Sequence, residues 1–216
     1  MTTRARPLAL GLLALGLLLL AGCDAGATER LEAGEDGVFG VALEEPVAKP
    51  DVVLTDHHGE PFDLRAETDG ELTLAFFGYA SCPDICPVHM ANLTSVFDRL
   101  PSTITDRINV LFVTTDPARD TPEALEVFMG SFDDDFVGLT GDLDDIVGLM
   151  TDLNLPRPVF EEPDDDGFYE VGHPAQVLAF LPDDDHAHYA YPWGTRQSDF
   201  THDLRALVDG VAAARD

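Results

Sequence analysis

Two cysteines separated by three residues are the first feature of this chain that suggests chemistry. Cys82 and Cys86 enclose Pro83-Asp84-Ile85 and follow an apolar run at residues 72–79. A thiolate is a nucleophile for disulfide exchange and also a ligand for soft metal ions. A disulfide between the two would close only a very short loop and would add little stability, which favours a functional pair. The motif therefore predicts a redox dithiol or a metal site, and its spacing is compatible with both.

A metal site at this pair needs a further ligand, and the chain contains seven histidines. Two thiolates and one imidazole suit Cu(I), whereas hard ions prefer carboxylates. His173 directly precedes a predicted buried strand, and its loop is expected to face the sheet end that carries the cysteines. His89, three residues after Cys86, is a weaker candidate. We interpret the other five as solvated surface residues: His57, His58, His186, His188 and His202.

The elements that position these residues follow from hydrophobic periodicity. Continuous apolar runs at 72–79 and 108–114 predict strands that are buried on both faces. Apolar residues at three- and four-residue spacing predict a helix over 87–100, directly after the cysteine pair. We also expect a hairpin at 52–64 and helices at 121–129, 142–153 and 200–214. Further strands are expected at 136–139, 168–171, 176–181 and 188–191. The strand at 168–171 is expected to pair with the next strand along the chain.

This order of elements predicts an α/β fold with a central sheet flanked by helices and an N-terminal hairpin. A cysteine pair where the first buried strand meets its helix is the thioredoxin-like arrangement. We therefore expect a thioredoxin-like sandwich over residues 50–216.

The first residues have the composition of an export signal. Arg4 and Arg6 precede an apolar run at 8–20 that is short for a membrane span. The run ends in Leu20-Ala21-Gly22-Cys23, which resembles the lipobox of bacterial lipoproteins and implies cleavage before Cys23 and lipidation of its thiol. An ordinary signal peptide is the alternative. We expect a signal peptide at 1–22 and then, over 23–49, the lipidated cysteine and a flexible acidic tether.

The charge of the chain is extreme. It has 41 Asp and Glu against 12 Lys and Arg, which gives a formal net charge of −29. This excess of negative charge argues against nucleic acid or anionic lipid as a partner. We interpret it as a solvated acidic surface, of the kind suited to high salt, rather than as a dedicated docking patch.

Three segments together resemble the motifs of the Sco/SenC family. They are residues 77–87 around the cysteines, residues 112–122 (Phe-Val-Thr-Thr-Asp-Pro-Ala-Arg-Asp-Thr-Pro), and the Tyr-x-Val-x-His pattern at 169–173. The resemblance implies a thioredoxin-like domain held outside the cytoplasmic membrane. It also implies that Cys82, Cys86 and His173 are copper ligands, and that the protein helps to build the binuclear copper centre of cytochrome c oxidase.

We therefore expect a copper metallochaperone of the cell envelope that binds Cu(I), with Cu(II) as a further candidate. Its expected partners are the copper-bearing subunit of cytochrome c oxidase or another copper carrier, and the membrane through the lipid anchor. The alternative is a thiol-disulfide reductase in which Cys82 and Cys86 act on acceptor cysteines of the same subunit. A peroxiredoxin-like peroxidase ranks last, because no Thr-x-x-Cys with a partner arginine is evident.

The acidic residues of the second motif have two interpretations. Asp116 and Asp120 fit a turn and a helix start. Alternatively, Asp116 follows a strand that ends at the same sheet edge, and it orients His173 or receives a charged partner. A carboxylate bonded to a ligating imidazole is a common arrangement. Arg119 is expected to pair with either acid at the surface.

Overall fold

The computed structural model describes residues 32–210. Eight strands form the main sheet, and two short ones form a separate ribbon. The main strands are β1 (Val41–Ala48), β2 (Val53–Asp56), β3 (Pro61–Asp63), β4 (Leu72–Gly78), β5 (Ile108–Thr114), β6 (Val137–Thr140), β9 (Val177–Phe180) and β10 (His186–Tyr191). The ribbon consists of β7 (Val159–Phe160) and β8 (Val171–Gly172). The helices are α1 (Ile85–Phe97), α2 (Ser102–Thr105), α3 (Pro122–Met129), α4 (Leu143–Asp152) and α5 (Gln197–Leu207).

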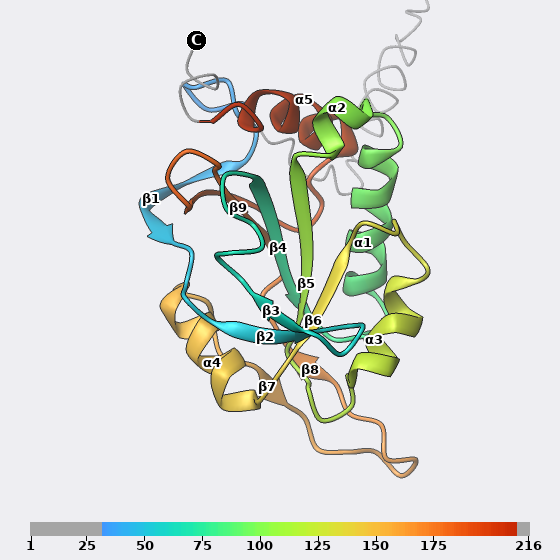
Figure 1. Cartoon of the computed structure of the whole chain (residues 1–216). Coiled ribbons are helices and arrows are strands. Elements are labelled where there is room, and N and C mark those ends of the chain that lie inside the picture. Colours follow the sequence, from blue (N-terminus) through green and yellow to red (C-terminus); the bar gives the residue numbers. More distant parts are fainter. Residues whose placement is uncertain (1–31, 211–216) are drawn as a thin grey trace, which may run out of the picture. The chain divides into compact units, whose positions relative to one another are not determined.

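The main sheet is mixed, with the strand order β1-β10-β9-β4-β5-β6-β2-β3 (Figure 1). Its centre is the parallel set β4, β5 and β6, and β9 runs antiparallel to β4 on the other side. The predicted hairpin is present as β2 and β3, and β2 joins the sheet through β6. The predicted α/β class is therefore confirmed.

The central strand β4 separates two apolar cores. All seven of its residues are buried. Leu74 and Phe76 pack with apolar residues of α1, α3 and α5, whereas Ala75 and Phe77 pack with those of α4. Because successive side chains of a strand point to opposite faces, only a continuous apolar run can serve both cores.

The expected tether up to residue 49 is wrong at its C-terminal end. Residues 41–48 form β1, which pairs antiparallel with β10 at the sheet edge. Most of its side chains are exposed, including Glu44 and Glu45, so its composition resembles that of a tether. Backbone pairing rather than apolar burial holds this strand, and composition does not reveal such pairing. The domain therefore begins before residue 50.

Two side chains fix this N-terminal segment to the domain. The buried carboxylate of Asp203 accepts hydrogen bonds from the backbone N–H groups of Phe39 and Gly40, both at 2.9 Å. Lys49, the only lysine of the chain, is buried, and its ammonium donates to Asp185 Oδ1 at 2.7 Å and to the Thr68 carbonyl at 3.2 Å.

Three smaller expectations also differ from the structure. β8 pairs with β7, which precedes it, and not with the next strand along the chain. α1 spans Ile85–Phe97, whereas the prediction was 87–100, so the helix begins two residues and ends three residues earlier than predicted. α5 ends at Leu207, whereas the prediction ran to 214, beyond the described residues. The predicted signal peptide and Cys23 also lie outside the described residues. Within 32–210, no helix has both the length and the apolar composition of a membrane span.

Candidate metal centre

The two cysteines lie where β4 passes into α1. The chain leaves β4 at Gly78, turns with the Cys82 N–H donating to the Tyr79 carbonyl at 3.1 Å, and enters the helix at Ile85. Cys86 is the second residue of α1 and is buried, whereas Cys82 is half-buried. Both thiols are free. A strand that ends at a helix N-terminus thus presents one enclosed sulfur and one accessible sulfur.

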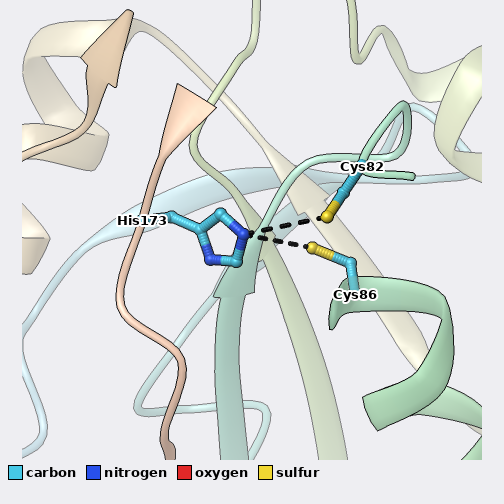
Figure 2. Close-up of side chains that lie close together, drawn as sticks. All are labelled: Cys82, Cys86 and His173. Atoms are coloured by element: carbon cyan, nitrogen blue, oxygen red, sulfur yellow. Dashed lines mark hydrogen bonds between the residues drawn. The ribbon is translucent and has the colours of Figure 1, made fainter. Parts of the chain in front are cut away.

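His173 follows β8 directly and brings its imidazole to the same point. Figure 2 shows the ring directed at both sulfurs. The Nε2 atom lies 4.0 Å from Cys82 Sγ and 3.5 Å from Cys86 Sγ. Ligand atoms of these three residues all lie within 4.8 Å of one another, and no other such group of His, Cys, Asp or Glu occurs in the described part of the chain. The structure thus brings together the three residues that the sequence singled out.

The hydrogen bonding of His173 determines which ring nitrogen carries the proton, and therefore which one offers a lone pair to a metal. Its Nδ1 atom lies 2.9 Å from the carbonyl oxygen of Pro174. A carbonyl only accepts hydrogen bonds, so Nδ1 carries a proton, and in the neutral ring Nε2 is then bare. Ligating histidines commonly donate their other N–H to a carbonyl in this way. The imidazole is therefore in the tautomer that a metal at the sulfurs requires.

The two thiols differ strongly in acidity. The hydrogen bond from the Cys86 thiol lowers the pKa of Cys82 to about 4, with help from the backbone N–H groups of Cys86 and Asp84. The same bond, together with burial, raises the pKa of Cys86. At neutral pH Cys82 is therefore the thiolate and Cys86 the S–H donor. This arrangement offers a nucleophile on the accessible side and a second ligand that must lose a proton before it binds metal.

The comparisons with known proteins agree with this geometry. A family model described as SCO1/SenC matches residues 42–209. The chain belongs to the SCO1/SenC family. A SCO2-like protein of Rickettsia felis is 37% identical over 123 residues, a match that covers 57% of this chain and 59% of the relative. The chain thus matches less than two thirds of that relative's length.

Solved structures share the fold of this SCO1/SenC member. The structure of Bradyrhizobium japonicum ScoI with copper bound is 28% identical, with a TM-score of 0.64 over 77% of this chain and 99% of that one. The solution structure of apo Sco1 from Thermus thermophilus is 27% identical, with a TM-score of 0.68 over 79% of this chain and 96% of that one. The predicted thioredoxin-like fold is thereby confirmed.

His89 and Asp116, the two further candidates from the sequence, do not join the metal centre of this SCO1/SenC domain. His89 is buried on α1, and its Nε2 lies 2.9 Å from the carbonyl of Ala175, so this ring nitrogen carries a proton and donates. Asp116 is also fully buried, but it binds Tyr169 and Arg119 rather than His173. Asp116 thus makes no direct hydrogen bond to the imidazole, and it receives a charged partner, Arg119, as the other half of that hypothesis expected.

Asp120 has a partner set that its position in the sequence does not reveal. Its Oδ2 atom accepts hydrogen bonds from Thr114 Oγ1 at 2.6 Å and from the Ala80 N–H at 2.8 Å. This buried carboxylate therefore ties the end of β5 to the loop that carries Cys82. The interpretation as a helix-start residue missed this link, because the loop is 40 residues earlier in the chain.

Among the other histidines, the prediction of surface exposure is wrong for His57. Its ring is buried, and Nδ1 accepts the N–H of Gly138 at 3.1 Å. Its Nε2 therefore carries the proton of the neutral ring, which leaves no free lone pair for a metal. His188 and His202 pair with Asp184 and Asp203 respectively.

Proposed function

We propose that this protein is a copper metallochaperone of the cell envelope, which binds Cu(I) through Cys82, Cys86 and His173 and helps to assemble the binuclear copper centre of cytochrome c oxidase. The observation that carries the proposal is the convergence of two sulfurs and one bare imidazole nitrogen on a single point. Membership of the SCO1/SenC family and the copper in the similar ScoI structure support it.

The donor set explains why the cargo is Cu(I). Two thiolates and an imidazole form a soft site, and Cu(I) prefers thiolates to the carboxylates that surround the domain. Only three ligands are offered, so the cargo remains open to exchange with the ligands of an acceptor. The half-buried Cys82 lines a surface hollow together with Pro83, Ile85, Glu170 and His173, and an acceptor approaches through this hollow. The expected acceptor is the copper-bearing subunit of cytochrome c oxidase, or another copper carrier.

A thiol-disulfide reductase is the second candidate, and the acidity difference between the two thiols favours it. The Cys82 thiolate attacks one sulfur of an acceptor disulfide, which forms a mixed disulfide and releases the other acceptor sulfur as a thiolate. Cys86 then loses its proton and attacks Cys82 Sγ. The products are a Cys82–Cys86 disulfide and a reduced acceptor dithiol, so two electrons pass to the acceptor. The oxidised form binds no copper, because the thiolates are the ligands.

Reconstitution with Cu(I) tests the proposal and separates it from the alternative. The reduced wild-type domain should bind one Cu(I) per chain, measured by competition with a coloured Cu(I) chelator. His173→Ala should abolish tight binding while both thiols remain titratable. The matched control His188→Ala, at an imidazole outside the metal centre, should bind as the wild type does. Intact copper binding in His173→Ala, together with fast exchange of disulfide substrates, would instead establish the reductase.

The anchor and the location belong to the same proposal. Cys23 carries the lipid, and the domain lies on the outer side of the membrane, where copper oxidases are assembled. The apolar leader that ends at Leu20-Ala21-Gly22-Cys23 supports this arrangement. Expression of Cys23→Ser tests it. The variant should leave the membrane fraction and lack the lipid mass, whereas retention of both would contradict the anchor.

A further inference from the structure

We infer that Tyr169, Asp116 and Arg119 are positioning residues that hold the segment carrying His173, so that its imidazole meets the two cysteine sulfurs. The inference deepens the proposed function and rests on it. None of the three residues is a metal ligand. They affect metal binding by fixing the position of His173.

The buried carboxylate of Asp116 joins two parts of the chain. Asp116 lies just after β5 and is fully buried. Its own N–H donates to Thr114 Oγ1 at 2.9 Å, which fixes the residue to the end of the strand. Its Oδ1 atom accepts the hydroxyl of Tyr169 at 3.1 Å, and its Oδ2 atom is paired with Arg119 Nε. Both carboxylate oxygens are therefore used, and one of them reaches the His173 segment.

Arg119 adds a second contact to the same tyrosine. Its guanidinium carbon lies 3.6 Å from the ring centroid of Tyr169, a stacking distance for a cation over an aromatic face. The rings of Tyr79 and Phe168 lie 5.4 and 5.8 Å from the same carbon. The Nη2 atom is buried with no hydrogen-bond partner, so the guanidinium has given up some hydration to occupy this position. One end of the guanidinium is thus enclosed, while the side chain as a whole is only partly buried.

The segment between Tyr169 and His173 has little other secondary structure to hold it. β8 has two residues and pairs only with β7, outside the main sheet. On β7, Val159 and Phe160 are exposed, and Val171 of β8 is the only buried side chain of the four ribbon residues, so the ribbon has almost no apolar core of its own. A two-stranded ribbon of this size is not stable by itself. The contacts of Tyr169 therefore supply a fixed point four residues before the metal-binding imidazole.

Two further contacts complete the placement of His173. The buried ring of Tyr79 meets its imidazole edge-on, with ring centroids 5.6 Å apart. Beyond His173, the Ala175 carbonyl accepts from His89 on α1, the helix that also carries Cys86. The imidazole is thus held from both sides. Among the contacts that place it, the hydrogen bond from the Tyr169 hydroxyl can be removed with the smallest change, because the substitution deletes a single oxygen atom.

Tyr169→Phe is the test, because it deletes the hydroxyl and keeps the ring. Tyr189→Phe is the matched control, since its hydroxyl also donates to a carboxylate, Asp36 Oδ2 at 2.8 Å, away from the metal centre. Tyr169→Phe should weaken Cu(I) binding by about 10- to 100-fold, the usual loss when a group that orients a ligand is removed. The control should bind as the wild type does. Unchanged affinity in Tyr169→Phe would overturn the inference.

A double-mutant cycle separates positioning from general stability. In a His173→Ala background, Tyr169→Phe should cause no further loss of the residual Cu(I) affinity, because the residue acts only through the imidazole. The same loss in both backgrounds would show a merely structural role. Arg119→Lys, which keeps the charge but loses the planar stack, should weaken binding in the same direction.

Amide hydrogen exchange of the metal-free protein gives a readout that does not depend on copper. Exchange at residues 171–173 should be faster in Tyr169→Phe than in the wild type, and unchanged in Tyr189→Phe. If the wild type binds no Cu(I), the proposed function fails, and this measurement still decides the positioning role. Equal exchange in both variants would refute it.

Discussion

The substitution Gly78→Ala tests how tightly the fold confines the buried sulfur. Gly78 is the last residue of β4, and a Cβ atom placed there would lie 2.5 Å from Cys86 Sγ. The same atom would lie 3.1 Å from Phe76 Cε1 and 3.2 Å from Phe112 Cε2. These rings belong to the core and leave the added methyl group no other direction. The sulfur or the start of α1 must therefore move.

The size of the required movement sets the expected effect. Ordinary contacts between such atoms are about 3.5–4.0 Å, so the sulfur must retreat by about 1 Å. Metal–ligand distances tolerate only about 0.2 Å. We expect Cu(I) affinity to fall by about 100-fold, the loss that a misplacement of about 1 Å causes in other preorganised sites. Crowding of the core should also cost about 1–3 kcal/mol of stability.

Competition with a Cu(I) chelator measures the affinity, and urea unfolding of the metal-free domain measures the stability. Gly138→Ala is the matched control, because its added Cβ would also be crowded, at 2.8 Å from Met129 Cγ, but away from the metal centre. The control should lose stability and keep its copper affinity. If Gly78→Ala folds and binds Cu(I) as tightly as the wild type, the Cys86 sulfur is not confined as the structure indicates.

Two more predictions concern protons. Because Cys82 is already a thiolate at neutral pH and Cys86 is not, Cu(I) binding at pH 7 should release about one proton per metal. Calorimetry in buffers of different ionisation enthalpy measures this number, and a release of two would show that Cys82 is protonated. Burial lowers the pKa of His89 in the folded state. Below about pH 6.5, this histidine therefore takes up a proton more readily in the unfolded chain than in the folded one. The folded state then loses stability by up to about 1.4 kcal/mol for each unit that the pH falls. The free energy of unfolding, measured with urea between pH 7 and 5, should fall less steeply with decreasing pH in His89→Gln than in the wild type. An equal pH dependence in both proteins would show that His89 is not the responsible group.

The interior strands could be predicted from the sequence because their signal is local and strong. Residues 108–114 form β5 as predicted, and the helix begun by Thr121 and Pro122 ends at Met129 as predicted. Burial on both faces demands an unbroken apolar run, and a capped helix start is a short pattern. β1 has neither signal. Its place depends on β10, about 140 residues later in the chain, and no local composition encodes that pairing.

By itself, the sequence determined the dithiol, its place between a strand and a helix, and His173 as the third candidate ligand. These depend on residue type and on neighbours along the chain. Only the tertiary structure decided which nitrogen of His173 faces the sulfurs, that His89 donates to a carbonyl, and that Asp116 accepts from Tyr169 rather than from the imidazole. Each of these is a hydrogen bond whose donor and acceptor are chosen by packing. The Cys82-x3-Cys86 motif supplies two soft ligands, and the packing of separate segments supplies the geometry that makes them a metal centre.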